Sequence, residues 1–306
     1  MAQVVLVHGI GQERESADSL EAKWLPSLAG GIRSAGYGSL ADALRRDPLT
    51  VRMAFYGDLF RTRDQQGIED VELTPEQWAV AKPLAREWLD RLAARGTRAT
   101  DRQLADQERE LLDQPGETQG MRAALRPVLR ALVRMRPFAR LGVGFAERFL
   151  VRALRQVSLY LTDDSIREKA LARVLDLIDK DTKVLLGHSL GSVVAYEAAH
   201  RLAHPLPLLV TVGSPLGLRT VVYECLRPQP PGVPPSLRRW VNLVDPDDLV
   251  AAEPDLATGF PGPAGILNSG YTVDNGATPH EATFYLTASE TGRPIAEALT
   301  AATLGR

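Results

Sequence analysis

The fold of this chain is decided by one short stretch, KVLLGHSLGS at residues 183–192. An apolar run at 184–186 is typical of a buried strand, and a helix-compatible run follows at 192–202. Between them stands the pattern G-x-S-x-G, which exposes its serine on a sharp turn from strand to helix. The glycines are needed because a side chain there would crowd the neighbouring strand or helix. The stretch predicts Ser189 as a nucleophile at a helix N-terminus; an ordinary glycine-rich loop is the alternative.

Other segments continue an alternation of strands and helices, which predicts an α/β domain. Asp58 is expected to cap a helix, and Pro26 to kink or divide one. Residues 251–279 are rich in glycine, proline and polar side chains, so we expect them to be irregular. The predicted strands are 3–7, 51–56, 208–212 and 239–244, and the predicted helices are 19–35, 165–179 and 294–304.

Residues 59–165 interrupt this alternation. They offer no convincing strand and are rich in Leu, Ala, Arg and Glu, so we expect a helical insertion, a lid or cap, between two parts of a core at 1–58 and 166–306. Within it, 121–161 is basic and amphipathic, which is compatible with peripheral membrane contact. A helix that buries its apolar face and solvates its arginines is the preferred interpretation. The arginines recur every fourth residue at Arg122, Arg126, Arg130 and Arg134.

Composition excludes several classes of protein. The 306 residues carry a net charge of −2, which gives no reason to expect a nucleic-acid partner. A single cysteine, Cys225, can build neither a disulfide framework nor a cysteine-based metal site. There is no signal-peptide pattern and no apolar run long enough for a transmembrane helix, so a cytoplasmic protein is expected. The oligomeric state is left open.

A nucleophilic serine needs a base, and elimination among five histidines points to His280. His8 and His188 belong to loops around the serine. His200 and His204 fall at the far end of the helix that starts at the serine, about 15 Å away at the helical rise per residue. His280 lies after the last clear predicted strand, where the base is expected in the order serine, acid, histidine.

The acid is expected just after the strand at 239–244. Asp248 is the first choice and Asp245 the alternative, although Asp245 could instead tie the turn before the following proline. Asp255 and Asp274 are less favoured because each stands in irregular sequence. The neighbouring carboxylates, Asp247 among them, could also suggest a cation site, but turn formation and solvation are preferred, and no metal or cofactor is expected.

An oxyanion hole needs two N–H donors aimed at one point. Leu190, directly after the serine, supplies the first. The second is expected from the loop at 8–11, which resembles the HG-type oxyanion loop of lipases and esterases; Ile10 is the first choice and Gly11 the second. The same glycines could start a dinucleotide-binding loop, but the third glycine of that motif is replaced by Arg14.

Taken together, these motifs resemble the α/β-hydrolase superfamily, and within it bacterial lipase- and esterase-like proteins related to GPI-inositol-deacylase-like hydrolases. The resemblance rests on residues 7–12, 187–191 and 245–250 and on His280, and it covers the core but not the insertion. It implies a mostly parallel sheet with helices on both faces, lacking the first two strands of the full fold. The site would lie at the carboxyl ends of the strands.

The resemblance also implies ester chemistry. The expected function is a serine hydrolase that cleaves carboxylic esters, small or of lipid type, through an acyl-enzyme and without a cofactor. An acyltransferase with the same three residues and a non-catalytic protein that binds a partner on a hydrolase fold are the alternatives.

Overall fold

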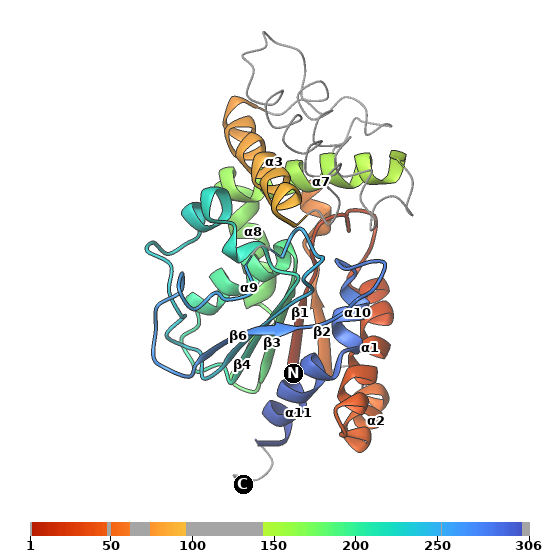
Figure 1. Ribbon diagram of the computed structural model, residues 1–306. Coiled ribbons are helices and arrows are strands. Elements are labelled where there is room, and N and C mark those ends of the chain that lie inside the picture. The colour runs from red at the N-terminus through yellow and green to blue at the C-terminus, as the bar shows by residue number, and fades with distance from the viewer. Residues whose placement is uncertain (1, 48–49, 62–73, 96–142, 252, 302–306) are drawn as a thin grey trace. The chain divides into compact units, whose positions relative to one another are not determined.

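The computed structural model describes residues 2–47, 50–61, 74–95, 143–251 and 253–301 (Figure 1). The chain divides into two compact units, Met1–Phe60 with Ser165–Arg306, and Arg61–Asp164. In the second unit the described residues form two helices that pack together, α3 (Pro75–Arg95) and α7 (Val143–Thr162). The four arginines that recur every fourth residue lie outside the described residues, whereas residues 143–161 of the basic segment form most of α7.

The first unit is built on a six-stranded sheet in which every neighbouring pair of strands is parallel. The order across the sheet is β2-β1-β3-β4-β5-β6. The fold is therefore α/β with an all-parallel sheet. The strands are β1 (Val4–Val7), β2 (Val51–Ala54), β3 (Val184–His188), β4 (Leu208–Val212), β5 (Trp240–Val244) and β6 (Leu267–Thr272).

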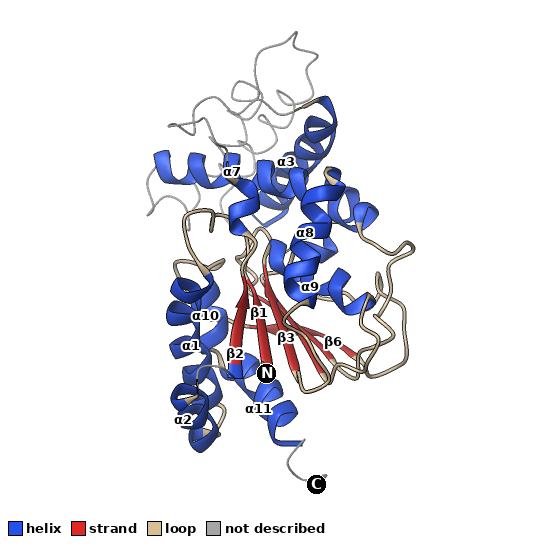
Figure 2. Ribbon diagram, turned by 180° about the vertical axis from the view of Figure 1, so that it is seen from behind, coloured by secondary structure: helices blue, strands red, loops and turns tan. Residues whose placement is uncertain are grey.

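Helices cover both faces of the sheet (Figures 1 and 2). Side chains of β1 alternate, so Val4 and Leu6 join the core under one layer of helices while Val5 and Val7 are buried on the other face. The first layer contains α1 (Ala17–Ser34), α10 (Ala282–Thr287) and α11 (Ser289–Ala301), with α2 (Gly38–Arg46) packed on α1. The second contains α8 (Asp164–Leu175) and α9 (Leu190–His200).

The strand order places the predicted site at the carboxyl ends of the neighbouring strands β1 and β3. After β1 the chain crosses to one neighbour, β2, and it later returns on the other side as β3, so the order reverses between β1 and β3. At such a switch point the loops after the two strands separate and leave room for a ligand. Those loops carry His8–Gly11 and Ser189.

Several sequence predictions about elements were wrong. Of the two outcomes expected at Pro26, division of the helix is wrong: α1 runs on for about two further turns, and it is fixed at its start by a capping box between Ser16 and Ser19. Asp58 is not a helix cap: it lies in a short 3₁₀ helix, η2 (Gly57–Phe60), and its carboxylate accepts two hydrogen bonds from Arg173.

The region expected to be irregular contains β6, and α2 was not predicted. β6 is half-buried to exposed, and it includes Gly270 with a φ of 94°, so it shows none of the apolar pattern by which buried strands are recognised. Among the described residues, no helix combines the length and the apolar character that crossing a membrane requires.

Candidate active site

Ser189 lies on a strained turn between β3 and α9. Its φ is 54° and its ψ −130°, and it is the one residue other than glycine with a positive φ in the described part of the chain. A Cβ built on Gly187 would lie 2.5 Å from the carbonyl oxygen of Gly191, and one built on Gly191 would overlap the carbonyl oxygens of Val7 and His8. The two glycines are therefore required by close approach of the backbone, as the sequence predicted.

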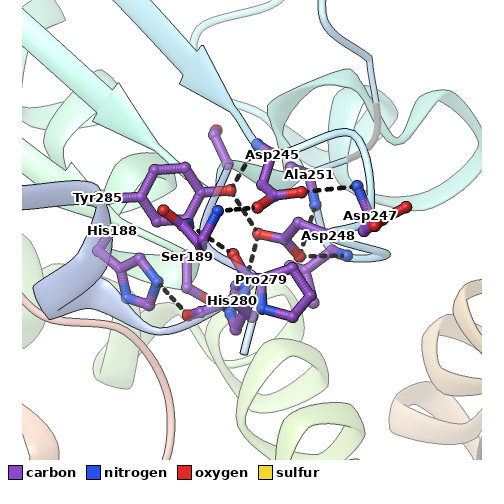
Figure 3. Close-up of polar contacts among 12 residues, drawn as sticks. His188, Ser189, Asp245, Asp247, Asp248, Ala251, Pro279, His280 and Tyr285 are labelled. Carbon is purple, nitrogen blue, oxygen red and sulfur yellow. Dashed lines mark hydrogen bonds and ion pairs between the residues drawn. The ribbon is translucent and has the colours of Figure 1, made fainter. Parts of the chain in front are cut away.

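A chain of hydrogen bonds links the serine to a histidine and a carboxylate (Figure 3). The distance from His280 Nε2 to Ser189 Oγ is 3.0 Å, and the distance from His280 Nδ1 to Asp248 Oδ2 is 2.8 Å. A carboxylate can only accept, so Nδ1 carries the proton and the lone pair of Nε2 faces the serine hydroxyl. The structure thus brings together the three residues predicted as nucleophile, base and acid.

The environment of Asp248 keeps its carboxyl group ionised. Burial alone raises the pKa of Asp248, but His280, the Tyr285 hydroxyl and the Val250 N–H together hold this pKa below its ordinary value. The Val250 N–H donates to Oδ1 at 2.9 Å, and the Tyr285 hydroxyl donates to Oδ2 at 2.9 Å. Gly213, directly after β4, has a φ of 56°, and a Cβ there would lie 3.0 Å from Oδ2.

The carboxylate of Asp245, the alternative acid, binds two backbone N–H groups. It accepts the N–H of Asp247 at 2.8 Å and that of Asn275 at 2.6 Å, and it joins the end of β5 to the loop that leads to His280. Burial raises the pKa of Asp245. The two less favoured carboxylates also serve their own loops: Asp255 accepts from the Ser269 hydroxyl and Asp274 from the Gly276 N–H.

The loop after β1 lies directly on the serine. A Cβ built on Gly9 would stand 2.6 Å from Ser189 Cβ, so only a glycine fits there. Within the described residues, the N–H groups of Ile10 and Leu190 take part in no hydrogen bond. Leu190 starts α9, where the first N–H groups of a helix have no acceptor in the preceding turn. The two predicted oxyanion donors are therefore free to bind an oxygen, whereas Gly11 has contacts of its own.

His8 fixes the shape of this loop. Its Nδ1 donates to the Gly9 carbonyl at 2.7 Å, and its Nε2 accepts the Tyr56 N–H at 3.1 Å. The Tyr56 hydroxyl in turn donates to the His8 carbonyl at 2.6 Å. Burial lowers the pKa of His8 to about 4, so the ring stays neutral and both nitrogens keep these roles.

His188 packs against His280, the predicted base. Its Nε2 donates to the backbone carbonyl of His280 at 3.0 Å, and the two ring centroids are 4.7 Å apart (Figure 3). Burial, with a smaller effect from His280, lowers the pKa of His188 to about 3, and the neutral ring adds no positive charge beside the base. On its other side the ring meets the indole of Trp24 edge-on.

Sequence reasoning missed the roles of His188 and Tyr285. His188 occupies the variable position between the glycine and the serine of the motif, and the motif sets no requirement for the residue type there. Tyr285 stands in a short apolar helix, where a buried tyrosine is an ordinary core residue. The one available signal was proximity along the chain, since Tyr285 follows His280 by little more than one helical turn.

The described residues contain no group of three or more His, Cys, Asp or Glu side chains placed to hold a metal ion. Comparison of the chain with models of protein families, with curated proteins and with solved structures finds no significant match. Any functional conclusion must therefore rest on the site itself.

Proposed function

We propose that this protein is a serine hydrolase of the α/β-hydrolase type that cleaves carboxylic esters. The observation that carries the proposal is the continuous chain from Asp248 through His280 to Ser189, with distances of 2.8 and 3.0 Å. A nucleophile in hydrogen-bond reach of a base, with the base oriented by a third group, is the arrangement that activates a hydroxyl. The all-parallel sheet, with the site at the carboxyl ends of its strands, supports the fold type.

In the first half of the reaction, Ser189 Oγ attacks the carbonyl carbon of the ester while His280 Nε2 takes the hydroxyl proton. The imidazolium is stabilised by the Asp248 carboxylate, which stays ionised. The carbonyl oxygen becomes an oxyanion that accepts from the N–H groups of Leu190 and Ile10. When the tetrahedral intermediate collapses, the bond to the alcohol oxygen breaks, and that oxygen takes the proton from His280.

The second half repeats these steps with water. His280 accepts a proton from a water molecule as the water oxygen attacks the acyl-enzyme. Collapse of the second tetrahedral intermediate returns the proton to Ser189 Oγ and releases the carboxylic acid. Every proton in this cycle passes through His280 Nε2, which is why its tautomer has to be fixed by Asp248.

Hydrolysis of a panel of p-nitrophenyl esters, from acetate to palmitate, tests the proposal. We expect turnover by the native protein and a loss of about 10⁴-fold or more in kcat for Ser189→Ala, because the nucleophile is removed. Ser236→Ala is the matched control: its hydroxyl donates to the Ala199 carbonyl at the far end of α9, and activity should be retained. The chain-length profile decides between small and lipid-type esters.

Two outcomes would contradict the proposal. One is native protein that hydrolyses no ester of the panel, and the other is Ser189→Ala with native activity. If added alcohol at low concentration diverts most of the acyl groups into a new ester, the protein is an acyltransferase that uses the same nucleophile.

A further inference from the structure

Tyr285 binds the same carboxylate oxygen of Asp248 as the histidine does. Its hydroxyl donates to Asp248 Oδ2 at 2.9 Å and accepts the backbone N–H of Asp245 at 2.8 Å (Figure 3). The donor and acceptor capacities of the hydroxyl are therefore both used. The same oxygen, Oδ2, also accepts the proton-bearing Nδ1 of His280. One carboxylate oxygen is thus shared between the base and a phenol.

The hydroxyl of Tyr285 is a permanent donor. The side chain is fully buried, and burial raises the pKa of Tyr285 far above its ordinary value, so the proton stays on the phenol. The Asp245 N–H occupies the oxygen from the other side, which leaves the hydroxyl proton one acceptor, Asp248 Oδ2. The direction of this hydrogen bond therefore cannot reverse.

The placement of Tyr285 in the fold links three parts of the site. Helix α10 starts two residues after His280, so one short segment carries both partners of Asp248 Oδ2. The Asp245 N–H fastens the same hydroxyl to the end of β5. Among the described residues, the titratable groups around this centre include His280, His188, His8, Asp245 and Asp247.

We propose that Tyr285 is a positioning residue whose hydroxyl orients the Asp248 carboxylate and limits its hold on the His280 proton. The inference rests on the proposed function and adds a residue that sets the basicity of the site. A donor on Oδ2 withdraws electron density from the oxygen that faces the imidazole. Without it, the carboxylate attracts the imidazolium more strongly, and its orientation loses one of the hydrogen bonds that fix it beside those of the backbone N–H groups on Oδ1.

The test is Tyr285→Phe, which removes the hydroxyl and keeps the ring. We expect the acidic limb of the kcat/KM profile to move to higher pH by about half a unit, because the carboxylate loses one of several hydrogen-bond donors and stabilises the imidazolium more strongly. We expect kcat to fall about tenfold, because the acid and base lose part of their alignment. KM should change little, since the hydroxyl is bonded on both sides within the protein and does not reach a substrate.

Tyr196→Phe is the matched control. The Tyr196 hydroxyl has the same pattern of one donated and one accepted hydrogen bond, to the carbonyl of Gly232 at 2.9 Å and from its N–H at 3.1 Å. It lies on α9 and touches none of the three proposed catalytic residues. Both variants should lower the melting temperature, whereas only Tyr285→Phe should move the pH profile. An unchanged profile and kcat in folded Tyr285→Phe would overturn the inference.

A second variant covers the case in which Tyr285→Phe does not fold. 3-Fluorotyrosine introduced at position 285 keeps the hydroxyl and makes it a stronger donor, so the acidic limb should move to lower pH. A shift to higher pH, or none, would contradict the proposal. The native protein, measured in the same assay, separates the role of Tyr285 from the proposed hydrolase function. If the native protein hydrolyses esters through Ser189 but neither variant shifts the pH profile, the inference about Tyr285 fails and the proposed function stands.

Discussion

Ser189 shows how much a single residue is constrained in this structure. A positive φ costs a residue with a side chain about 1–3 kcal/mol, so the surroundings must impose it. They do so through the close backbone packing at the glycines two positions before and after it and through the Ser189 N–H, which donates to the Val212 carbonyl at 3.1 Å. The strain holds the hydroxyl 3.0 Å from His280 Nε2.

Substitution of the two candidate acids should give opposite results. Asp248→Asn keeps the size but can donate to Nδ1 and so favours the wrong imidazole tautomer; we expect kcat to fall about 10⁴-fold. Asp245→Asn leaves either the buried N–H of Asn275 or the partly buried N–H of Asp247 without its acceptor and should lower the free energy of unfolding by about 1–3 kcal/mol, with less than about tenfold loss of activity. Urea unfolding and ester hydrolysis measure the two effects. A larger loss of activity in Asp245→Asn would reassign the acid.

The sequence was sufficient to predict the site residues whose positions follow from a motif or from their order along the chain. Ser189 followed from the spacing of its glycines, His280 from elimination, and Asp248 from its position after a predicted strand; the structure brings all three together. It could not reveal Tyr285, because that role depends on the side-by-side placement of α10 and the end of β5. Such a contact between distant segments leaves no local pattern.

At the scale of elements, α1 packs against α10 and α11. Two adjacent glycines of α1, Gly30 and Gly31, differ in how closely this neighbouring backbone approaches them. A Cβ on Gly31 would overlap the carbonyl oxygens of Leu286 and Ala288. A Cβ on Gly30 would meet only the Thr287 methyl group, at 3.8 Å. Gly31 thus allows the close approach of the helices, whereas Gly30 gains nothing from lacking a side chain.

Alanine at these two positions should change stability in opposite directions. Gly30→Ala should raise the free energy of unfolding by about 0.5–1 kcal/mol, since alanine favours a helix over glycine. Gly31→Ala should lower it by about 1–3 kcal/mol or more, because the helices are forced apart. Urea unfolding monitored by circular dichroism measures both. Equal effects of the two substitutions would show that the packing of α1 is not as described.

Elements differ in how far the sequence predicts them. The buried strands β1, β3, β4 and β5 were predicted because continuous apolar runs must lie between two layers of helices. The edge strand β6 has polar and glycine residues, since only one of its sides pairs with a strand and its surface is partly exposed.

At the scale of the whole molecule, the parallel sheet is what assembles the site. The loops after β1, β3, β4 and β5 leave the same edge, and they carry Gly9, Ser189, Gly213 and Asp248. His280 joins them from the segment after β6. Residues far apart in the chain thus meet because the strands are parallel, and the neutral His8 and His188 lie buried between the loops.

These two histidines should make the fold sensitive to acid. Their pKa values in the folded state, about 4 and about 3, lie below the ordinary 6.5. Between pH 6.5 and these lowered pKa values, the unfolded chain therefore binds more protons than the folded protein does. Stability is complete above about pH 6.5 and should fall with decreasing pH by about 1.4 kcal/mol per unit for each histidine. Urea unfolding at a series of pH values measures the slope.

His188→Gln is the control for this slope. The glutamine amide can donate to the His280 carbonyl but does not titrate, so the loss of stability in acid should become less steep by about 1.4 kcal/mol per pH unit. Stability that is independent of pH in the native protein, or a slope unchanged in His188→Gln, would contradict the assignment of a buried neutral imidazole.

The most direct test of the central claim, that Ser189 is an activated nucleophile, is the site at which a fluorophosphonate reacts. Intact mass and peptide mapping of the treated protein should show one adduct, on Ser189, formed rapidly in the native protein and Ser236→Ala and not in Ser189→Ala. Asp248→Asn should react more slowly, because the imidazole tautomer is no longer fixed. An unlabelled native protein, or an adduct on another residue, would contradict the account.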